Sequence, residues 1–96
     1  MRRDEALRIL SSHRKELDEF GVKSLAIFGS IARDEAGPES DIDILVEFAR
    51  PVGLFEFVRL KTFLEKLLQR EVDLVTPDAL KERLREKILK EAISAA

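Results

Sequence analysis

The 96-residue sequence contains no cysteine, which excludes disulfide bonds and thiolate metal sites. It has a single histidine, so any metal ion must be held by oxygen ligands or by His13. Magnesium is the metal that such oxygen ligands suit. No run of 18 apolar residues is present, and the N-terminal residues lead into an amphipathic pattern rather than a secretion signal. We therefore expect a soluble, cytoplasmic protein without a membrane partner.

Neither sign of charge dominates, since 17 basic residues face 19 acidic ones and the formal net charge is −2. A dedicated nucleic-acid binder usually has a basic stripe and a high pI, so direct nucleic-acid binding is not expected. Hydrophobic residues make up 45% of the chain, which is typical of a globular protein. The length predicts a single domain over residues 1–96, with a two-layer core and little chain left for a second lobe.

Hydrophobic spacing predicts alternating helices and strands. Helices are expected over residues 4–20, 54–70 and from Thr76-Pro77 to about residue 93, with a short helix from Ser30; strands are expected over 22–28, 40–48 and 71–75. Gly21 is expected to end the first helix, and Thr76 and Pro77 to start the last one. The fold class is α/β (α+β), with helices on one face of a small mixed sheet.

The strand over residues 40–48 has two faces of different character. Its even positions, Ile42, Ile44, Val46 and Phe48, are apolar, whereas Asp41, Asp43 and Glu47 are three of its four odd positions. This alternation predicts a sheet with one face on a helical core and the other face toward solvent.

The two aspartates of this strand, Asp41 and Asp43, point to the same side of the sheet because they are two residues apart. Two neighbouring carboxylates repel each other, and a divalent cation bound between them removes that conflict. Asp73 is the expected third ligand, because its strand can lie beside the strand that contains Asp41 and Asp43. Three aspartates around two Mg²⁺ ions are the arrangement used for in-line phosphoryl or nucleotidyl transfer.

Gly29 and Ser30 directly follow an apolar strand and supply the second half of the candidate site. Glycine permits the unusual backbone angles of a tight turn and the close approach of a phosphate. The predicted helix after it presents free N–H groups to an anion, and the Ser30 hydroxyl adds a donor. Arg33, one turn later, is placed either to contact a phosphate oxygen or to pair with a nearby acid.

Each of these features alone has a commonplace explanation: a turn, a half-exposed strand or an exposed arginine. Their occurrence in this order, on these elements, favours a nucleoside triphosphate site. Glu47 is expected to lie too far along the strand to join it, and His13 to be a helix-surface or interface residue. The charge-rich last helix is either a solvated face or a docking element for a partner.

The segment FGSIARDEAGPESDIDILVEF, with Gly29-Ser30, ten residues and then Asp41-x-Asp43, resembles the signature of the DNA polymerase beta superfamily of nucleotidyltransferases. The short chain and the later segment EVDLVTP resemble its minimal, MNT type. The resemblance implies a polymerase beta palm-like fold and ATP as substrate with two Mg²⁺ ions. It also implies attack of a hydroxyl on the α-phosphate with pyrophosphate leaving.

Carried onto this sequence, the resemblance implies that Asp41 and Asp43 ligate both metal ions and that Asp73 completes the catalytic metal site. Gly29 and Ser30 would hold the triphosphate. MNT-type proteins are often antitoxins of HEPN-domain ribonuclease toxins, and are thought to transfer AMP to a tyrosine of that partner.

Two departures from the family pattern stand out. Many members have glycine after the arginine, whereas Asp34 and Glu35 follow Arg33 here and add negative charge near the expected phosphate site. Larger members also have a second domain, and its absence leaves open whether this chain acts without a partner.

Two other classes of function compete with a nucleotidyltransferase acting on a partner protein. The first is a non-catalytic antitoxin or interaction module that neutralises its partner by docking. The second is a phosphatase or a glycosyltransferase with an Asp-x-Asp motif, which the order of elements opposes because Asp41 and Asp43 begin their strand. The identity of the nucleotide, the acceptor and the oligomeric state stay open.

Overall fold

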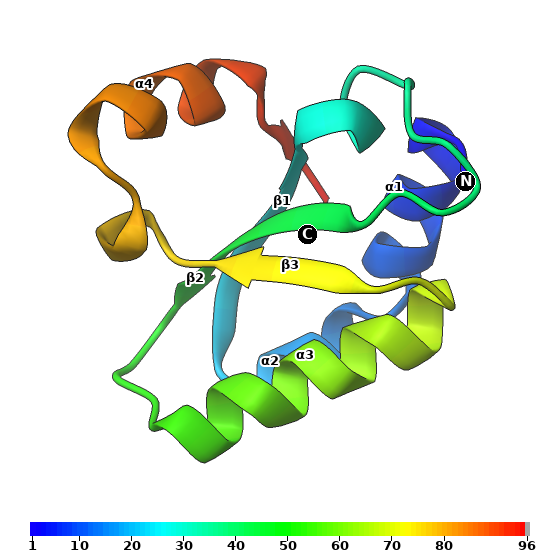
Figure 1. Ribbon diagram of the computed structural model, residues 1–96. Helices are drawn as coiled ribbons and strands as arrows, with labels where there is room; N and C mark the ends of the chain where they lie inside the picture. Colours follow the sequence, from blue (N-terminus) through cyan, green and yellow to red (C-terminus); the bar gives the residue numbers. More distant parts are fainter. Residues whose placement is uncertain (96) are drawn as a thin grey trace.

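The computed structural model describes residues 1–95, and in this range four strands form one mixed sheet in the order β3-β2-β1-β4 (Figure 1). The strands are β1 (Val22–Phe28), β2 (Ile42–Phe48), β3 (Val72–Val75) and β4 (Ile93–Ser94). β1 pairs antiparallel with both β2 and β4, whereas β2 and β3 are parallel. A parallel pair needs a crossover connection, and the long helix α3 provides it. The predicted mixed sheet is therefore confirmed.

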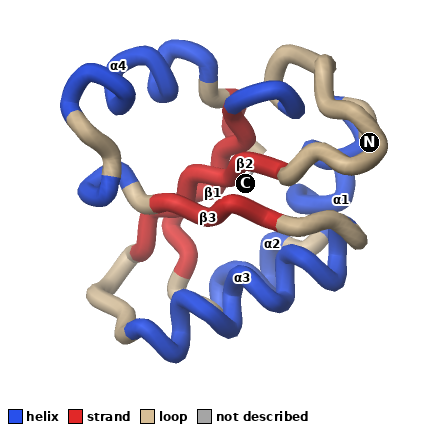
Figure 2. The backbone as a smooth tube through the Cα atoms, in the orientation of Figure 1, coloured by secondary structure: helices blue, strands red, loops and turns tan. Residues whose placement is uncertain are grey.

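The helices within residues 1–95 are α1 (Arg3–Ser12), α2 (Arg14–Glu19), α3 (Leu54–Leu68) and α4 (Glu82–Glu91), with 3₁₀ turns η1 (Gly29–Ile31) and η2 (Pro77–Ala79). α1, α2 and α3 contribute to the core on one face of the sheet. α4 stands apart from them, beyond the sheet and near η1, as the tube drawing also shows (Figure 2). Over this range, none of the helices combines the length and the apolar character needed to cross a membrane.

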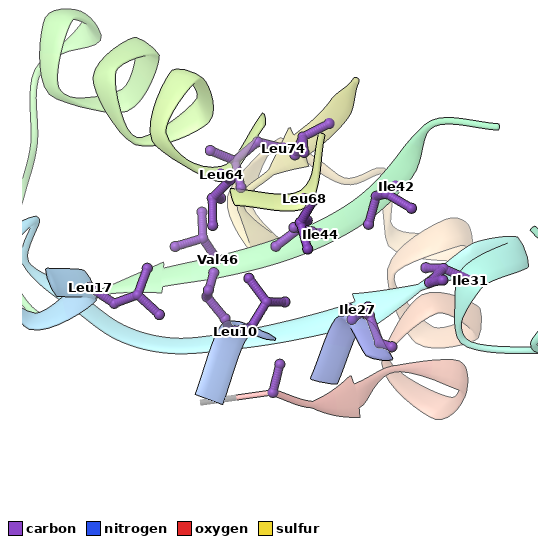
Figure 3. Close-up of a cluster of buried hydrophobic side chains, with 14 of the residues drawn as sticks. Leu10, Leu17, Ile27, Ile31, Ile42, Ile44, Val46, Leu64, Leu68 and Leu74 are labelled. Atoms are coloured by element: carbon purple, nitrogen blue, oxygen red, sulfur yellow. The ribbon is translucent and has the colours of Figure 1, made fainter. Parts of the chain in front are cut away.

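The core lies between the sheet and the first three helices, as the alternation in β2 predicts. Ile42, Ile44 and Val46 are buried on this face. They meet fully buried leucines of the helices, among them Leu10 and Leu64 (Figure 3). Burying each such side chain contributes about 1.5–3 kcal/mol, so this contact is the main stabilising element of the fold.

The opposite face of β2 is less open than expected. Leu45 on this face is 5% exposed and Phe28, opposite Asp43 on β1, is 8% exposed. The turns η1 and η2 both contact β2 and help to cover it. The sheet thus has a polar end around Asp43 rather than a wholly solvated face.

The prediction of one helix over residues 4–20 is wrong in one respect, because this segment is divided into α1 and α2 at His13. The Ser11 and Ser12 hydroxyls donate to the Arg8 carbonyl at 3.2 and 2.5 Å, and His13 Nδ1 lies 2.8 Å from the Ile9 carbonyl. Side chains that bind helix carbonyls in this way compete with the backbone ladder and interrupt it.

The second strand and the last helix also begin later than expected. Ser40 belongs to a turn, where its hydroxyl accepts from the Gly37 N–H at 2.9 Å, so β2 starts at Ile42. Thr76 makes no side-chain capping bond; η2 follows it, Leu80 is extended, and α4 starts at Glu82. The helix expected to reach residue 93 ends at Glu91. Ile93 instead belongs to β4, where it pairs with Ile27 of β1.

Candidate active site

The pairing register of the sheet brings two predicted site residues side by side. Asp43 of β2 is paired with Asp73 of the parallel strand β3, and directly paired residues point to the same face. On the other side Asp43 is paired with Phe28, the last residue of β1, so the Gly29 turn follows immediately beside it. Asp41 lies just before β2 and is exposed. The three aspartates therefore gather at one end of the sheet, next to Gly29.

The crowding of acids changes the protonation of Asp43. Partial burial, the largest cause, and the charges of Asp73, Asp41 and Glu91, in that order, together raise the pKa of the Asp43 carboxyl to about 6, while the charge of Arg33 lowers it. This carboxylate is half-buried and its charged neighbours are mostly negative. Such a group is stabilised in its ionised form by a bound cation.

Gly29 is required at its position for two independent reasons. Its φ of +70° lies in the left-handed region, which costs an L-residue with a side chain about 1–2 kcal/mol. A Cβ added here would also press on the Asp43 carboxylate, at 3.1 Å from Asp43 Cγ. The turn and β2 are thus packed closely against each other, and a side chain at position 29 would have to displace the Asp43 carboxylate.

The helix expected from Ser30 is a single 3₁₀ turn, which corrects the sequence-based prediction. The Gly29 carbonyl accepts from the N–H groups of Ala32 at 3.1 Å and Arg33 at 3.3 Å, and the Ser30 carbonyl accepts from Glu35 at 2.8 Å. A helix dipole grows with the number of aligned peptides, so one turn supplies little of it. A phosphate bound here would therefore be held by the turn itself, by the Ser30 hydroxyl and by nearby cations rather than by a helix dipole.

Arg33 pairs with acids, which is one of the two roles that the sequence allows. Its guanidinium Nη1 pairs with Glu91 Oε1 at the end of α4, and its Nε lies 3.4 Å from Glu35 Oε2. The Arg33 side chain is 49% exposed, whereas that of Glu91 is 19% exposed. Arg33 is thus half-exposed, and its charge is already paired with two acids.

Asp34, which departs from the family pattern, has a structural role. Its φ of +60° is left-handed, a conformation that glycine adopts freely and that aspartate tolerates better than most residues. Its Oδ1 accepts from the Arg3 N–H at 2.9 Å, and its Oδ2 lies 3.8 Å from Arg2 Nη2. The charge of Asp34 is therefore held at the start of α1, where a negative charge is favourable.

The donor set fits a divalent ion by its chemistry. Asp41, Asp43 and Asp73 offer hard carboxylate oxygens, and the repulsion among them is what a cation relieves. Within residues 1–95, no three acidic, histidine or cysteine side chains are already arranged around one metal position. Asp41 and Asp73 are exposed and free to change rotamer. His13 lies elsewhere, half-buried between α1 and α2, with its ring edge-on to Phe63 at 6.4 Å between ring centroids.

Two features of the structure, one beside the aspartates and one away from them, could not be predicted from the sequence. Glu91 belongs to a charge-rich helix in which no sequence pattern distinguishes it. The fold brings it into an ion pair with Arg33, 58 positions earlier in the chain. A hollow of about 930 Å³ opens at the other end of β2 and β3, bordered by Glu47, Arg50, Thr76, Asp78 and Arg85. Glu47 lies four residues beyond Asp43 along the strand, roughly 13 Å away, so this hollow is separate from the aspartates.

Comparison with known proteins agrees with this geometry. Residues 10–95 match the nucleotidyltransferase domain family. Protein adenylyltransferase MntA of Thermococcus cleftensis is 43% identical over 91 residues, which cover 94% of this chain and 92% of that protein. A solved structure of a minimal nucleotidyltransferase is 38% identical and superposes with a TM-score of 0.84. The match covers 97% of this chain and 95% of the matched one.

The same fold occurs in a more distant solved complex, that of a tri-AMPylated HEPN toxin of Shewanella oneidensis with an MNT antitoxin. The match has a TM-score of 0.66 at 19% identity and covers 94% of this chain and 71% of the matched one. At this identity the likeness concerns the fold alone. With the family match over residues 10–95 and the two nearer relatives, it follows that the chain belongs to the nucleotidyltransferase domain family, as a minimal nucleotidyltransferase of the MNT type.

Proposed function

We propose that this protein is a Mg²⁺-dependent adenylyltransferase that moves AMP from ATP onto a hydroxyl, most specifically a tyrosine of a HEPN-domain partner, and thereby acts as an antitoxin. The observation that supports it most is the direct pairing of Asp43 with Asp73 beside the Gly29 turn. The proposal assigns metal binding to this acid pair and phosphate binding to the turn that contacts it.

The site residues have distinct roles in this proposal. Asp41 and Asp43 would hold two Mg²⁺ ions, and Asp73 would complete the catalytic metal site. Bound there, Mg²⁺ supplies charge neutralisation at the α-phosphate and lowers the pKa of the attacking hydroxyl. Gly29 and Ser30 receive the triphosphate, which the absence of a side chain at Gly29 allows to approach closely. Arg33 contributes positive charge at the same end.

The choice of AMP and of a protein acceptor is supported by relatives. The MntA protein of Thermococcus cleftensis is a protein adenylyltransferase, and the Shewanella oneidensis complex joins an AMP-modified HEPN toxin to an MNT antitoxin. We extend both properties to this chain. We also propose a cytoplasmic location, in keeping with the lack of cysteine, and no nucleic-acid substrate, in keeping with the balanced charge.

The test is transfer of label from [α-³²P]ATP to a purified HEPN-domain protein, with Mg²⁺ present. We expect label on the partner, its loss with a chelator, and a fall of about 100-fold or more in the Asp41→Asn/Asp43→Asn variant. Glu47→Gln is the matched control, because Glu47 is an exposed acid on β2 outside the aspartate group. Equal labelling by the double variant would contradict the proposal.

A second candidate function is neutralisation of a partner by docking alone. One observation favours it: Leu54 and Phe55, at the start of α3, are 79% and 87% exposed, and Val58 is half-exposed beside them. Exposed apolar clusters of this kind often mark protein contacts. A variant with all three aspartates changed to asparagine should lose antitoxin activity if transfer is required. Full neutralisation by that variant without nucleotide would favour docking instead.

A further inference from the structure

The ion pair between Arg33 and Glu91 joins the candidate phosphate site to the far end of the chain. Arg33 lies two residues beyond the end of the η1 turn, and Glu91 is the last residue of α4. Side-chain oxygen Oε1 of Glu91 pairs with Nη1 of Arg33, and the Glu91 side chain is the more buried partner. A carboxylate thus already pairs with the guanidinium of Arg33, two residues beyond the candidate phosphate-binding turn.

α4 has few other attachments to the fold. Within the described chain this helix has no buried residue, and Leu84 and Leu89 on it are about half-exposed. It is fixed at its C-terminal end by the short strand β4, which pairs with β1, and by the Glu91–Arg33 pair. A helix with so little buried surface is easily displaced when one of these attachments is lost.

Glu91 also contributes to the negative charge around the aspartates. Its charge raises the pKa of Asp43, together with those of Asp73 and Asp41. An incoming triphosphate would therefore meet an additional acid, together with an arginine whose charge is partly neutralised.

We propose that Glu91 is a positioning residue that holds, in the nucleotide-free protein, the place at Arg33 that a phosphate oxygen takes when ATP binds. Binding of the triphosphate then releases Glu91 and loosens α4. This inference rests on the proposed function, because it assigns a competitor to the same nucleotide site.

The exchange is favourable on physical grounds. A guanidinium binds carboxylate and phosphate oxygens through the same charge-assisted geometry. An ion pair between partly exposed side chains contributes little, so a triphosphate with several negative charges displaces it readily. Release of Glu91 also removes one acid from the surroundings of Asp43 at the moment when phosphate charge arrives.

The first test is the affinity for a non-hydrolysable ATP analogue, measured by calorimetry with Mg²⁺. Removing the competing charge by Glu91→Gln should tighten binding by about two- to five-fold, the range expected for a partly exposed ion pair. Glu86→Gln is the matched control, because Glu86 is on the same helix and pairs only with Lys90 at 3.7 Å within the described residues. Equal or weaker binding by Glu91→Gln would overturn the proposal.

A double-mutant cycle separates action through Arg33 from a general charge effect on Asp43. In an Arg33→Ala background, Glu91→Gln should no longer tighten binding, because the guanidinium for which Glu91 competes is absent. An unchanged gain in that background would show that Glu91 acts on the aspartates directly, and would overturn the role assigned here.

Amide hydrogen exchange gives a readout that does not depend on activity. The analogue should speed exchange in α4 of the native protein several-fold, and should leave it unchanged in Glu91→Gln, where α4 is already released. Slower exchange in α4 of the native protein on nucleotide binding would contradict the inference. If the native protein binds no nucleotide at all, the proposed function itself fails, which is a different result from binding without any effect of Glu91.

Discussion

The ionised carboxyl of Asp43 opposes the stability of the fold around it. Partial burial and the neighbouring acids raise its pKa to about 6, from an ordinary value of 3.8. Each pKa unit corresponds to about 1.4 kcal/mol, but this half-buried group is screened by water, so we expect Asp43→Asn to raise the free energy of unfolding at pH 7.5 by about 1 kcal/mol. Urea denaturation measures this gain, and the same variant should lose transfer activity.

The gain depends on pH with a definite sign. Because the folded protein holds the Asp43 proton to a higher pH than the unfolded chain does, this group favours folding below about pH 4. That advantage is lost as pH rises from about 4 to 6, and above this range the ionised carboxylate opposes folding by a constant amount. Native protein and Asp43→Asn should therefore have similar stability at pH 4 and differ at pH 7.5. An equal difference at both pH values would contradict this cause.

Gly29 should tolerate no side chain. We expect Gly29→Ala to lower the free energy of unfolding by about 1–2 kcal/mol from backbone strain alone, with a further loss from the contact with Asp43. Gly37→Ala is the control, because a Cβ there would make only an ordinary contact, 3.5 Å from Ser40 Oγ. Thermal denaturation should separate the two variants, and equal melting temperatures would refute the role of Gly29.

Much of the site could be predicted from single positions. The spacing of Asp41 and Asp43, and the glycine before Ser30, are local signals that need no knowledge of the tertiary fold. The pair between Arg33 and Glu91 could not be predicted, because it joins residues 58 positions apart and either side chain alone is commonplace on a helix or turn. The role of Asp34 was hidden for the same reason, since its partner lies in α1.

Among the helices, α4 differs from α3 in how much of it is buried. α3 has Leu60, Leu64 and Leu68 in the core, whereas α4, within the described residues, has no buried side chain. We expect amides of α4 in the nucleotide-free protein to exchange with solvent roughly 100-fold faster or more than those of α3. Hydrogen exchange with mass spectrometry checks this, and comparable protection in both helices would contradict it.

The elements were predicted best where the hydrophobic pattern was long and regular. In β2 a two-residue period fixed which face is buried, and α3 was expected to within two residues of its ends. The pattern failed at α1 and α2, where Ser11, Ser12 and His13 bind helix carbonyls and interrupt the backbone ladder. It failed again at β4, because a two-residue strand is defined by its neighbour β1 and has no period of its own.

For the protein as a whole, stability depends on one small core. Leu64 is fully buried in it, and Leu64→Ala should lower the free energy of unfolding by about 2–5 kcal/mol. The free energy of unfolding of small domains is only about 5–15 kcal/mol in total, so this variant should be partly unfolded near physiological temperature. Leu84→Ala on α4 is the matched control, because Leu84 is 52% exposed, and should change stability by less than about 1 kcal/mol. Similar losses from both variants would contradict this view of the core.

The place of Asp73 on β3 has a consequence apart from catalysis. β3 forms one edge of the sheet, and its other three residues, Val72, Leu74 and Val75, are apolar. Such an edge is a template on which a second molecule can add a strand, and a charged side chain discourages that pairing. The acid that completes the proposed metal site thus also protects this small protein against aggregation along its open edge.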